Sequence, residues 1–202
     1  EGEIAEKIDA FMKKHDGYLS KEDLATYKPQ WVEPVSTNYR GYDVWEIPPN
    51  GQGMVALMAL NVFKQLDAPE WQSAETFHQQ IEAMKLAFTD GQAFITDPDV
   101  MPISVEHLLS EEYAAKRAGT ITEEASNPEP YELPKGGTVY LAAADEEGNM
   151  ISYIQSNYMG FGSGIVIPGT GIGLKNRGHD FSLDESHPNV LKPGKLTYHT
   201  II

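Results

Sequence analysis

The feature that most constrains this chain is an abrupt change of pattern at Thr138. Before it lies a polar stretch, residues 127–137, which carries three prolines and ends in two glycines. From Thr138 to Ala144 the residues are mostly apolar and predict a buried strand. The Thr138 hydroxyl therefore stands at the junction between a linker and a rigid strand.

A hydroxyl at such a junction suits an N-terminal threonine nucleophile. If the peptide bond between Gly137 and Thr138 is cut, the new α-amine can serve as the base for the hydroxyl of the same residue. An α-amine has a pKa of about 7.7–8.0 in model peptides, so a useful fraction is neutral near neutral pH. Gly136 and Gly137 lack a Cβ, which lets the linker bend toward the hydroxyl. The alternative is a threonine that only begins a strand.

The composition excludes several classes of function. With 41% apolar residues, the 202-residue chain can form a sizeable core, as one large domain or two small ones. A formal net charge of −15 argues against nucleic-acid partners, which require a basic surface, and against anionic membrane surfaces. The absence of cysteine excludes disulfides, thiolate nucleophiles and cysteine-bound zinc.

The sequence leaves the compartment open. No apolar run reaches the roughly 18 residues of a membrane helix, and no signal peptide opens the chain. We therefore expect a soluble protein, either cytoplasmic or secreted or periplasmic. The first residues look like the start of a helix and the last like a strand cut short, which indicates a fragment of a longer protein.

Helical patterns dominate the first 137 residues. Apolar spacing, serine N-caps and glycine stops predict helices over residues 4–16, 20–27, 52–66 and 73–88, and one or two helices over 104–117. Aromatic and β-branched residues predict strands over 31–35 and 39–47, joined by a turn at 38–41. Residues 120–135 are polar and proline-rich, which predicts an exposed linker. The core is expected to include the apolar residues of the two longest helices, among them Met54, Met58, Phe77, Ile81 and Met84.

Strand patterns dominate from residue 138 onward. They predict strands over 138–144 and 150–155, with a turn at 145–149. Six glycines within residues 160–173 surround a short strand at 165–167, and their spacing does not match a phosphate-binding loop. They indicate either a close approach of the backbone to a ligand or the turns of a β-rich region. Helices followed by strands predict an α+β fold, with helices layered on a mostly antiparallel sheet.

The six histidines do not form a metal-binding pattern. No two of them lie four residues apart, and no H-E-x-x-H motif is present, so neither a metal nor a cofactor is expected. His179 and His199 fall in the strand-rich part and could line a pocket or lie on the surface. Asp180 stands beside Phe181 and could bind an amino group through a charge-assisted hydrogen bond. The alternative for Asp180 is a turn residue.

Longer motifs cover the whole chain. They are YRGYDVWEIPP at 39–49, HQQIEAMKLAF at 78–88, Asp97-Pro98 and LLSEEY at 108–113. The longest is SYIQSNYMGFGSGIVIPGTG at 152–171, followed by Asn176, DFS at 180–182 and PGK at 193–195. Together these motifs resemble the γ-glutamyltransferase (γ-glutamyltranspeptidase) family of N-terminal-nucleophile hydrolases, including its cephalosporin-acylase-like members. The resemblance spans essentially all 202 residues.

This resemblance implies a fold and a maturation step. The fold would be an αββα sandwich of the N-terminal-nucleophile hydrolase type, present here as a fragment. Residues 1–137 would end the large subunit and residues 138–202 would begin the small one, both cut from one precursor and forming one joint domain. By this analogy the precursor cleaves itself between Gly137 and Thr138.

The resemblance also assigns substrate contacts. Asp180 would hold the α-amino group of the acyl donor, and Asn157 lies near the asparagine of the family's pocket. His199 and Thr200 occupy the stretch where the family commonly has a pair of serines that contact the substrate carboxylate. These four residues are the candidate substrate contacts beside the nucleophile Thr138.

The function implied is that of an amide hydrolase or acyltransferase. Thr138 would attack a γ-glutamyl (glutathione-like) or related amide, form an acyl-enzyme and pass the acyl group to water or an amine. The substrate would be a small molecule. Val139-Tyr140 stand where the family commonly has Thr-His. The alternative is an inactive or only self-processing homologue that serves as a binding or scaffold protein.

Overall fold

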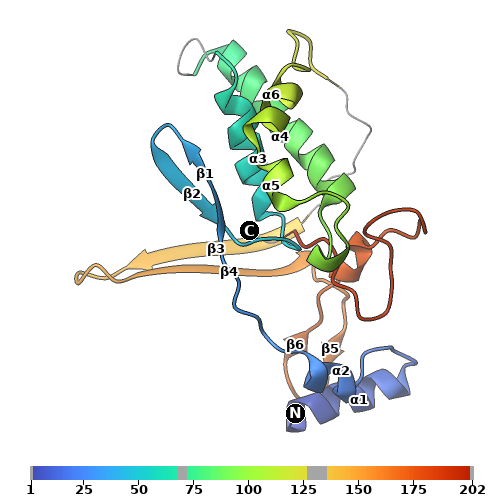
Figure 1. The fold of residues 1–202 in the computed structure, drawn as a ribbon. Helices are drawn as coiled ribbons and strands as arrows, with labels where there is room; N and C mark the ends of the chain where they lie inside the picture. The colour runs from blue at the N-terminus through green and yellow to red at the C-terminus, as the bar shows by residue number, and fades with distance from the viewer. Residues whose placement is uncertain (1, 68–71, 127–135, 201–202) are drawn as a thin grey trace. The chain divides into compact units, whose positions relative to one another are not determined.

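The computed structural model describes residues 2–67, 72–126 and 136–200. The chain forms two compact units, which Figure 1 traces as a ribbon. The first comprises Glu1–Trp31 and Leu133–Arg177, and the second comprises Val32–Glu132 and Gly178–Ile202. Of the linker predicted over residues 120–135, only 120–126 lie among the described residues.

The first unit combines two short helices with strand-forming segments of the C-terminal half. Its elements are α1 (Glu3–Lys14), α2 (Lys21–Thr26), β3 (Gly136–Ala144), β4 (Met150–Met159), β5 (Val166–Ile167) and β6 (Ile172–Gly173). In α2, the Ser20 hydroxyl accepts from the Asp23 N–H and the Asp23 carboxylate accepts from the Ser20 N–H, which completes a capping box. The two helices predicted in this part are confirmed, with ends that differ by at most two residues.

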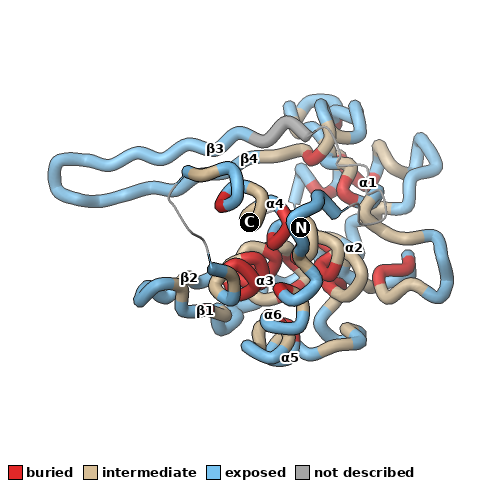
Figure 2. Tube along the Cα trace, turned by 90° about the horizontal axis from the view of Figure 1, so that it is seen from above, coloured by how far each residue is buried: buried red, intermediate tan, exposed pale blue. Residues whose placement is uncertain are grey.

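The β3–β4 hairpin is the longest strand pair of the first unit. Its strands run antiparallel and place Ala144 opposite Met150, so the turn at 145–149 is confirmed. The prediction of a buried strand is wrong, because residues 139–144 are exposed; Figure 2 shows the part of the hairpin around its turn in pale blue. Among the described strands, β3 pairs with β4 alone, so the hairpin forms a two-stranded sheet.

The second unit holds the helical core. Its elements are β1 (Val35–Tyr39), β2 (Tyr42–Glu46), α3 (Gly53–Lys64), α4 (Ala74–Phe94), the 3-10 turn η1 (Pro98–Val100), α5 (Val105–Leu108) and α6 (Glu111–Ala118). A second 3-10 turn, η2 (Arg177–Asp180), leads into it from the first unit. Ser73 caps α4 as predicted. The stretch 104–117, predicted as one or two helices, forms two, α5 and α6, which are capped by Ser104 and Ser110.

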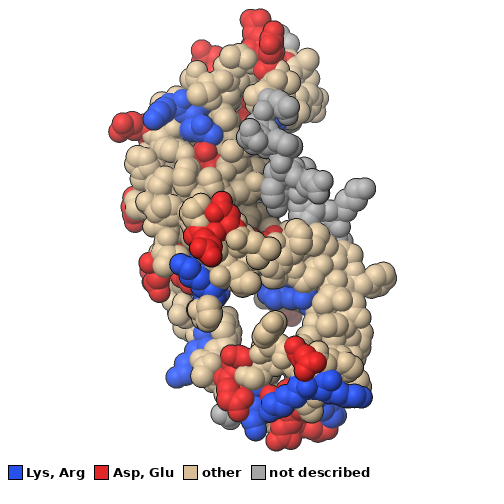
Figure 3. All heavy atoms as spheres, turned by 90° about the vertical axis from the view of Figure 1, so that its right-hand side faces the viewer, with Lys and Arg blue, Asp and Glu red and all other residues tan. Residues whose placement is uncertain are grey.

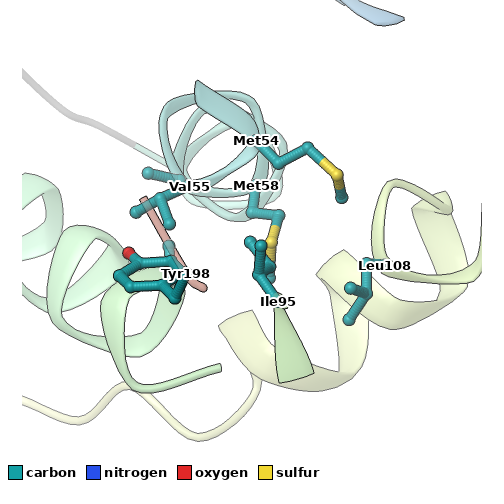
Figure 4. Packing of buried hydrophobic residues seen from close by; sticks show 8 residues of the cluster. Met54, Val55, Met58, Ile95, Leu108 and Tyr198 are labelled. Atoms are coloured by element: carbon teal, nitrogen blue, oxygen red, sulfur yellow. The ribbon is translucent and has the colours of Figure 1, made fainter. Parts of the chain in front are cut away.

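Helix α3 lies at the centre of this core, and Figure 2 shows it almost entirely buried. Its central cluster comprises Met54, Val55, Met58, Ala59, Ala87, Ile95, Leu108 and Tyr198. Figure 4 shows Met58 and Ile95 close together, with Tyr198 on one side and Leu108 on the other. Tyr198 comes from the C-terminal segment, which is thereby anchored to α3 through the core.

Helix α4 packs closely against α3 through a glycine. A Cβ added to Gly91 would lie 2.6 Å from Val55 Cγ2, a distance that real side chains do not tolerate. Ala83 and Ala87 lie on the same buried side of α4. The helices can therefore approach one another because small residues occupy their contact.

Two predictions for this unit are wrong. The first hairpin strand covers Val35–Tyr39 rather than residues 31–35, since Pro34 lacks the N–H that a ladder requires. Met54 and Met58 are buried as predicted, but Phe77, Ile81 and Met84 are exposed, because they lie on the side of α4 that faces away from α3.

The surface mixes charges of both signs. The formal net charge is −15, yet on the face drawn in Figure 3 lysine and arginine side chains lie beside the acidic ones. Within the ranges that the structure describes, no helix combines the length and apolar character needed to cross a membrane.

Candidate functional site

Thr138 lies in β3, where the strand pairing is irregular. Gly136 is opposite Met159, and Thr138 is opposite Ser156, so one residue on β3 faces two on β4. The extra residue forms a β-bulge at Asn157 and Tyr158, next to the predicted nucleophile. Bulges bend a strand and redirect its side chains, and they are frequent beside active sites.

Tyr158 adopts a conformation that is unusual for its residue type. Its φ is 78°, in the left-handed region that bulky side chains seldom occupy. Its N–H donates to the Ser156 hydroxyl at 2.9 Å, and the Arg177 guanidinium lies 5.0 Å from the centre of its ring. Both Tyr158 and Arg177 are buried. Such strain persists where surrounding contacts enforce it, which is common at functional sites.

Asn157 is held by Asn176 and by Gly162 of the glycine-rich segment. Its backbone oxygen accepts from the Asn176 N–H at 3.2 Å, and Asn176 Oδ1 accepts from the Met159 N–H at 3.0 Å. Gly162 has a φ of 70°, and a Cβ there would lie 2.5 Å from the Leu174 oxygen and 3.0 Å from Asn157 Cβ. Gly162 therefore packs closely against the bulge. The positive φ values of five glycines in this segment indicate turns, which is the second of the two alternatives left open by the sequence.

Asp180 ends η2 in the second unit and is held through its backbone. Asn189 Nδ2 donates to the Asp180 oxygen at 2.7 Å. Asn189 Oδ1 accepts from the Thr96 hydroxyl at 2.9 Å and from the Tyr198 N–H at 3.0 Å. Asn189 is only 3% exposed, so one buried amide fixes Asp180 next to the C-terminal segment.

His199 and Thr200 lie on that C-terminal segment, which binds to the loop before α3. The His199 N–H donates to the Asn50 oxygen at 2.9 Å, and the Gln52 N–H donates to the His199 oxygen at 2.9 Å. Gln52 Nε2 donates to the Thr200 oxygen at 2.7 Å. Because the Tyr198 side chain is buried and its N–H binds Asn189, the segment has a fixed position in its unit.

Two further charged residues support the same segment. Asp97 Oδ2 accepts from the Leu196 N–H at 3.0 Å. Lys195 Nζ donates to the Pro188 oxygen and, at 3.2 Å, to the Val190 oxygen, on either side of Asn189. Burial and the neighbouring charge of Lys192 lower the pKa of Lys195.

Asn189 is absent from the residues predicted from the sequence. Its partners lie nine residues away on either side and, at Thr96, 93 residues away, so no local pattern reveals its role. The only local signal is an asparagine between Pro188 and the apolar pair Val190-Leu191.

The predicted site residues thus form two groups, one in each unit. Thr138 and Asn157 share the first unit and lie on facing strands of one hairpin. Asp180, His199 and Thr200 share the second unit, where Asn189 links the two segments that carry them. Among the described residues, no group of three or more histidine and acidic side chains is arranged to hold a metal ion. The chemistry that these residues can supply is a hydroxyl nucleophile, a carboxylate, amides and an imidazole.

Comparison with known proteins identifies relatives over the full chain. The profile of the family described as Gamma-glutamyltranspeptidase matches residues 1–202. The Glutathione hydrolase-like YwrD proenzyme of Bacillus subtilis is 40% identical over 205 residues, which cover 100% of this chain and 39% of that protein. The Oxamate amidohydrolase proenzyme of Klebsiella pneumoniae is 34% identical over 200 residues, covering 99% of this chain and 38% of that protein.

A solved structure agrees with these relatives. The cephalosporin acylase of Bacillus halodurans has a TM-score of 0.89 and 62% sequence identity, covering 99% of this chain and 37% of that one. The chain therefore spans about two fifths of the length of the relatives it matches. The predicted fold class, an α+β fragment of the αββα N-terminal-nucleophile hydrolase type, is confirmed by this likeness. The chain belongs to the γ-glutamyltranspeptidase family.

Proposed function

We propose that this chain carries the processing site and part of the substrate site of a self-processing amide hydrolase or acyltransferase. The observation that carries the proposal is the position of Thr138 on β3, opposite Ser156 and next to the bulge at Asn157 and Tyr158, in a chain of the γ-glutamyltranspeptidase family. Relatives of this chain are named proenzymes, which supports maturation by cleavage. Residues 1–137 would then belong to the large subunit and residues 138–202 to the small one.

The first reaction is self-cleavage. The Thr138 hydroxyl oxygen attacks the Gly137 carbonyl carbon and loses its proton, the Gly137–Thr138 C–N bond breaks, and the nitrogen takes up a proton. The ester that results is hydrolysed by water, which leaves a carboxylate on Gly137 and a free α-amine on Thr138. No cofactor is needed, because the nucleophile and the leaving amine belong to the same residue.

The second reaction is turnover of an external amide. The free α-amine accepts the proton of the Thr138 hydroxyl while the oxygen attacks the acyl carbon of the donor, and the leaving amine is protonated as it departs. Water or a second amine then attacks the acyl-enzyme and restores Thr138. A neutral α-amine is required, and its ordinary pKa of about 7.7–8.0 makes this form accessible near neutral pH.

Four residues are proposed to bind the donor. Asp180 would pair with an α-ammonium group, and Asn157, His199 and Thr200 would contact the acyl chain and its carboxylate. The rigid attachment of Asp180 and of the 197–200 segment to Asn189 supports this role, because binding groups gain affinity when they are held in place before the ligand arrives.

The class of donor can be tested with two amides. The complete natural protein is incubated with a chromogenic γ-glutamyl anilide and with the matching glutaryl anilide, which lacks the α-amino group. Release of the chromogenic amine from either compound supports the proposed hydrolase. If the protein is not cleaved and hydrolyses neither compound, the alternative of a binding or scaffold protein replaces this proposal.

A further inference from the structure

The bulge in β4 faces the peptide bond at which cleavage is proposed. Gly137 faces two residues of β4, Asn157 and Tyr158. Its neighbours Gly136 and Thr138 pair with the residues on either side of these two. A regular ladder holds the peptide groups of a strand in a repeating orientation, whereas a bulge interrupts the repeat and increases the local twist. The irregularity therefore falls on the residue whose carbonyl carbon is attacked in the proposed self-cleavage.

The orientation of this peptide group decides whether the attack can occur. The Thr138 hydroxyl belongs to the residue directly after Gly137, so the two reacting groups are already neighbours in the chain. What has to be set is the angle of approach, because the oxygen must lie over the face of the Gly137 carbonyl group rather than in its plane. A displacement of about 1 Å at a reacting bond can cost about 100-fold in rate. Contacts that fix the backbone opposite Gly137 can therefore control the rate of cleavage.

Tyr158 gives the bulge its conformation. Its φ of 78° lies in the left-handed region, which costs a residue with a Cβ about 5- to 30-fold in population. Among the described residues other than glycine, a positive φ occurs besides at Asp16, Arg40 and Gln72, and all three are exposed residues in turns. Tyr158 is the buried one of the four, at 5% exposed. Its conformation is therefore enforced by the contacts around it.

Asn176 and Arg177 supply such contacts. The Asn176 N–H donates to the Asn157 oxygen at 3.2 Å, and Asn176 Oδ1 accepts from the Met159 N–H at 3.0 Å. Asn176 thus binds the backbone on both sides of Tyr158. The Arg177 guanidinium lies 5.0 Å from the centre of the Tyr158 ring, and Arg177 is 3% exposed. We call Asn176 and Arg177 the brace, because they hold the backbone beside Tyr158 and its ring.

We propose that the bulge, held by the brace, orients the Gly137 peptide group for self-cleavage, with Tyr158 as the positioning residue. This inference rests on the proposed function, in which the bond between Gly137 and Thr138 is cut. The bulge, the brace and the bond all belong to the first unit. The role depends on the left-handed backbone of Tyr158 rather than on the chemistry of its side chain, and a pair of substitutions can separate the two.

The test replaces Tyr158 with two small polar residues of similar size in the complete natural protein. Asparagine tolerates the left-handed region, whereas threonine is β-branched and is a genuine outlier there. Tyr158→Asn and Tyr158→Thr both remove the ring, so the main difference between them is the backbone preference. Freshly synthesised precursor is kept well below the melting temperatures of both variants and sampled over time. The two fragments are quantified by gel and identified by mass spectrometry.

We expect Tyr158→Thr to be cleaved between about fivefold and about 100-fold more slowly than Tyr158→Asn. The lower limit is the smallest penalty for the left-handed conformation, and the upper limit is the loss for a displacement of about 1 Å at the reacting bond. A role in stability alone predicts different melting temperatures but equal cleavage rates, because both variants are folded under these conditions. Equal rates in the two variants, whether fast or slow, overturn the inference.

Tyr153 provides the matched control in the same strand. It lies in β4, and its φ is not positive. Threonine suits a strand at least as well as asparagine does, so Tyr153→Thr should be cleaved at least as fast as Tyr153→Asn. Faster cleavage of the asparagine variant at both positions would show that the effect does not come from the backbone of Tyr158, and would also overturn the inference.

Asn176→Ala keeps the inference testable if the Tyr158 variants do not fold. It removes the bond to the Met159 N–H and should slow self-cleavage about fivefold, the equivalent of one ordinary hydrogen bond. Asn149→Ala, the same change in the exposed turn of the hairpin, should cleave at the wild-type rate. A wild-type rate in Asn176→Ala would then overturn this inference and leave the proposed function intact. A wild-type protein that is never cut between Gly137 and Thr138 overturns the proposed function itself.

Discussion

Asn189 donates a hydrogen bond to the backbone oxygen of Asp180 at 2.7 Å while its other amide atom accepts from the Tyr198 N–H at 3.0 Å. The two proposed binding segments of the second unit are therefore connected by a single buried side chain. Because both ends of the amide are used, the orientation of Asn189 is fixed, and each segment limits the movement of the other.

We predict that Asn189→Asp destabilises the protein by about 3 kcal/mol. The carboxylate keeps the two acceptor contacts but cannot donate to the Asp180 oxygen, and it places a charge at a position that is 3% exposed. Urea unfolding measures the loss. The control is Asn38→Asp, the same change at an exposed residue, which should stay within about 1 kcal/mol of wild type. Equal losses at both positions would contradict the role of Asn189.

Asp180→Asn is predicted to discriminate between donors. A charge-assisted hydrogen bond is worth roughly 1.5–3 kcal/mol, or about 10- to 150-fold in affinity, so kcat/KM for the γ-glutamyl anilide should fall by that factor. The glutaryl anilide lacks the amino group and should be nearly unaffected, as should self-cleavage. Equal losses of kcat/KM for the two donors would show that Asp180 does not bind the amino group and would favour its being only a turn residue.

Gly91→Ala is predicted to destabilise the protein by about 1–2 kcal/mol. The added methyl group would lie 2.6 Å from Val55 Cγ2. The destabilisation by overpacking exceeds the stabilisation from the better helix propensity of alanine. Gly119→Ala is the control, because its new Cβ would meet nothing closer than 3.5 Å and its φ is −63°. Thermal unfolding measures the change in melting temperature of each variant relative to wild type. The two changes should differ in sign or clearly in size. Similar melting temperatures would contradict the close contact of α3 and α4.

The contribution of Glu82 to stability is predicted to depend on pH. Burial raises its pKa, but hydrogen bonds from Lys85 and Ser126 and the charge of Lys85 together lower the pKa by more. The folded state therefore favours the ionised form, and the contribution is full above the unfolded pKa of about 4.5. It is lost as pH falls below that value and through the folded pKa. The difference in unfolding free energy between wild type and Glu82→Gln should therefore be larger at about pH 7 than at about pH 4. If the difference in unfolding free energy between the two proteins is larger at about pH 4 than at about pH 7, the downward shift of the Glu82 pKa is contradicted.

Local rules predicted most of the secondary structure. The cap at Ser73 and the box formed by Ser20 and Asp23 act within four residues of sequence, so the sequence alone reveals them. The β3–β4 hairpin is predictable for the same reason, because its turn at 145–149 is local.

Burial and long-range contacts were harder to predict. Phe77, Ile81 and Met84 follow a helical spacing, but only the packing of α3 against the opposite side of α4 decides that they are exposed. The pairing of Glu82 with Ser126 joins residues 44 positions apart, and a carboxylate on a helix is ordinarily expected on the surface. The bulge at Asn157 and Tyr158 depends on the register of the two strands, which a sequence does not display.

The central claim is that Thr138 becomes the first residue of a new subunit and acts as its nucleophile. Mass spectrometry of the complete natural protein and of its Thr138→Ala variant, after purification, tests this most directly. We predict a wild-type fragment whose N-terminal residue is Thr138, and a variant that stays uncut and turns over the anilide donors at least about 10⁴-fold more slowly. A cut at another bond, or retained cleavage and turnover in Thr138→Ala, would contradict this claim.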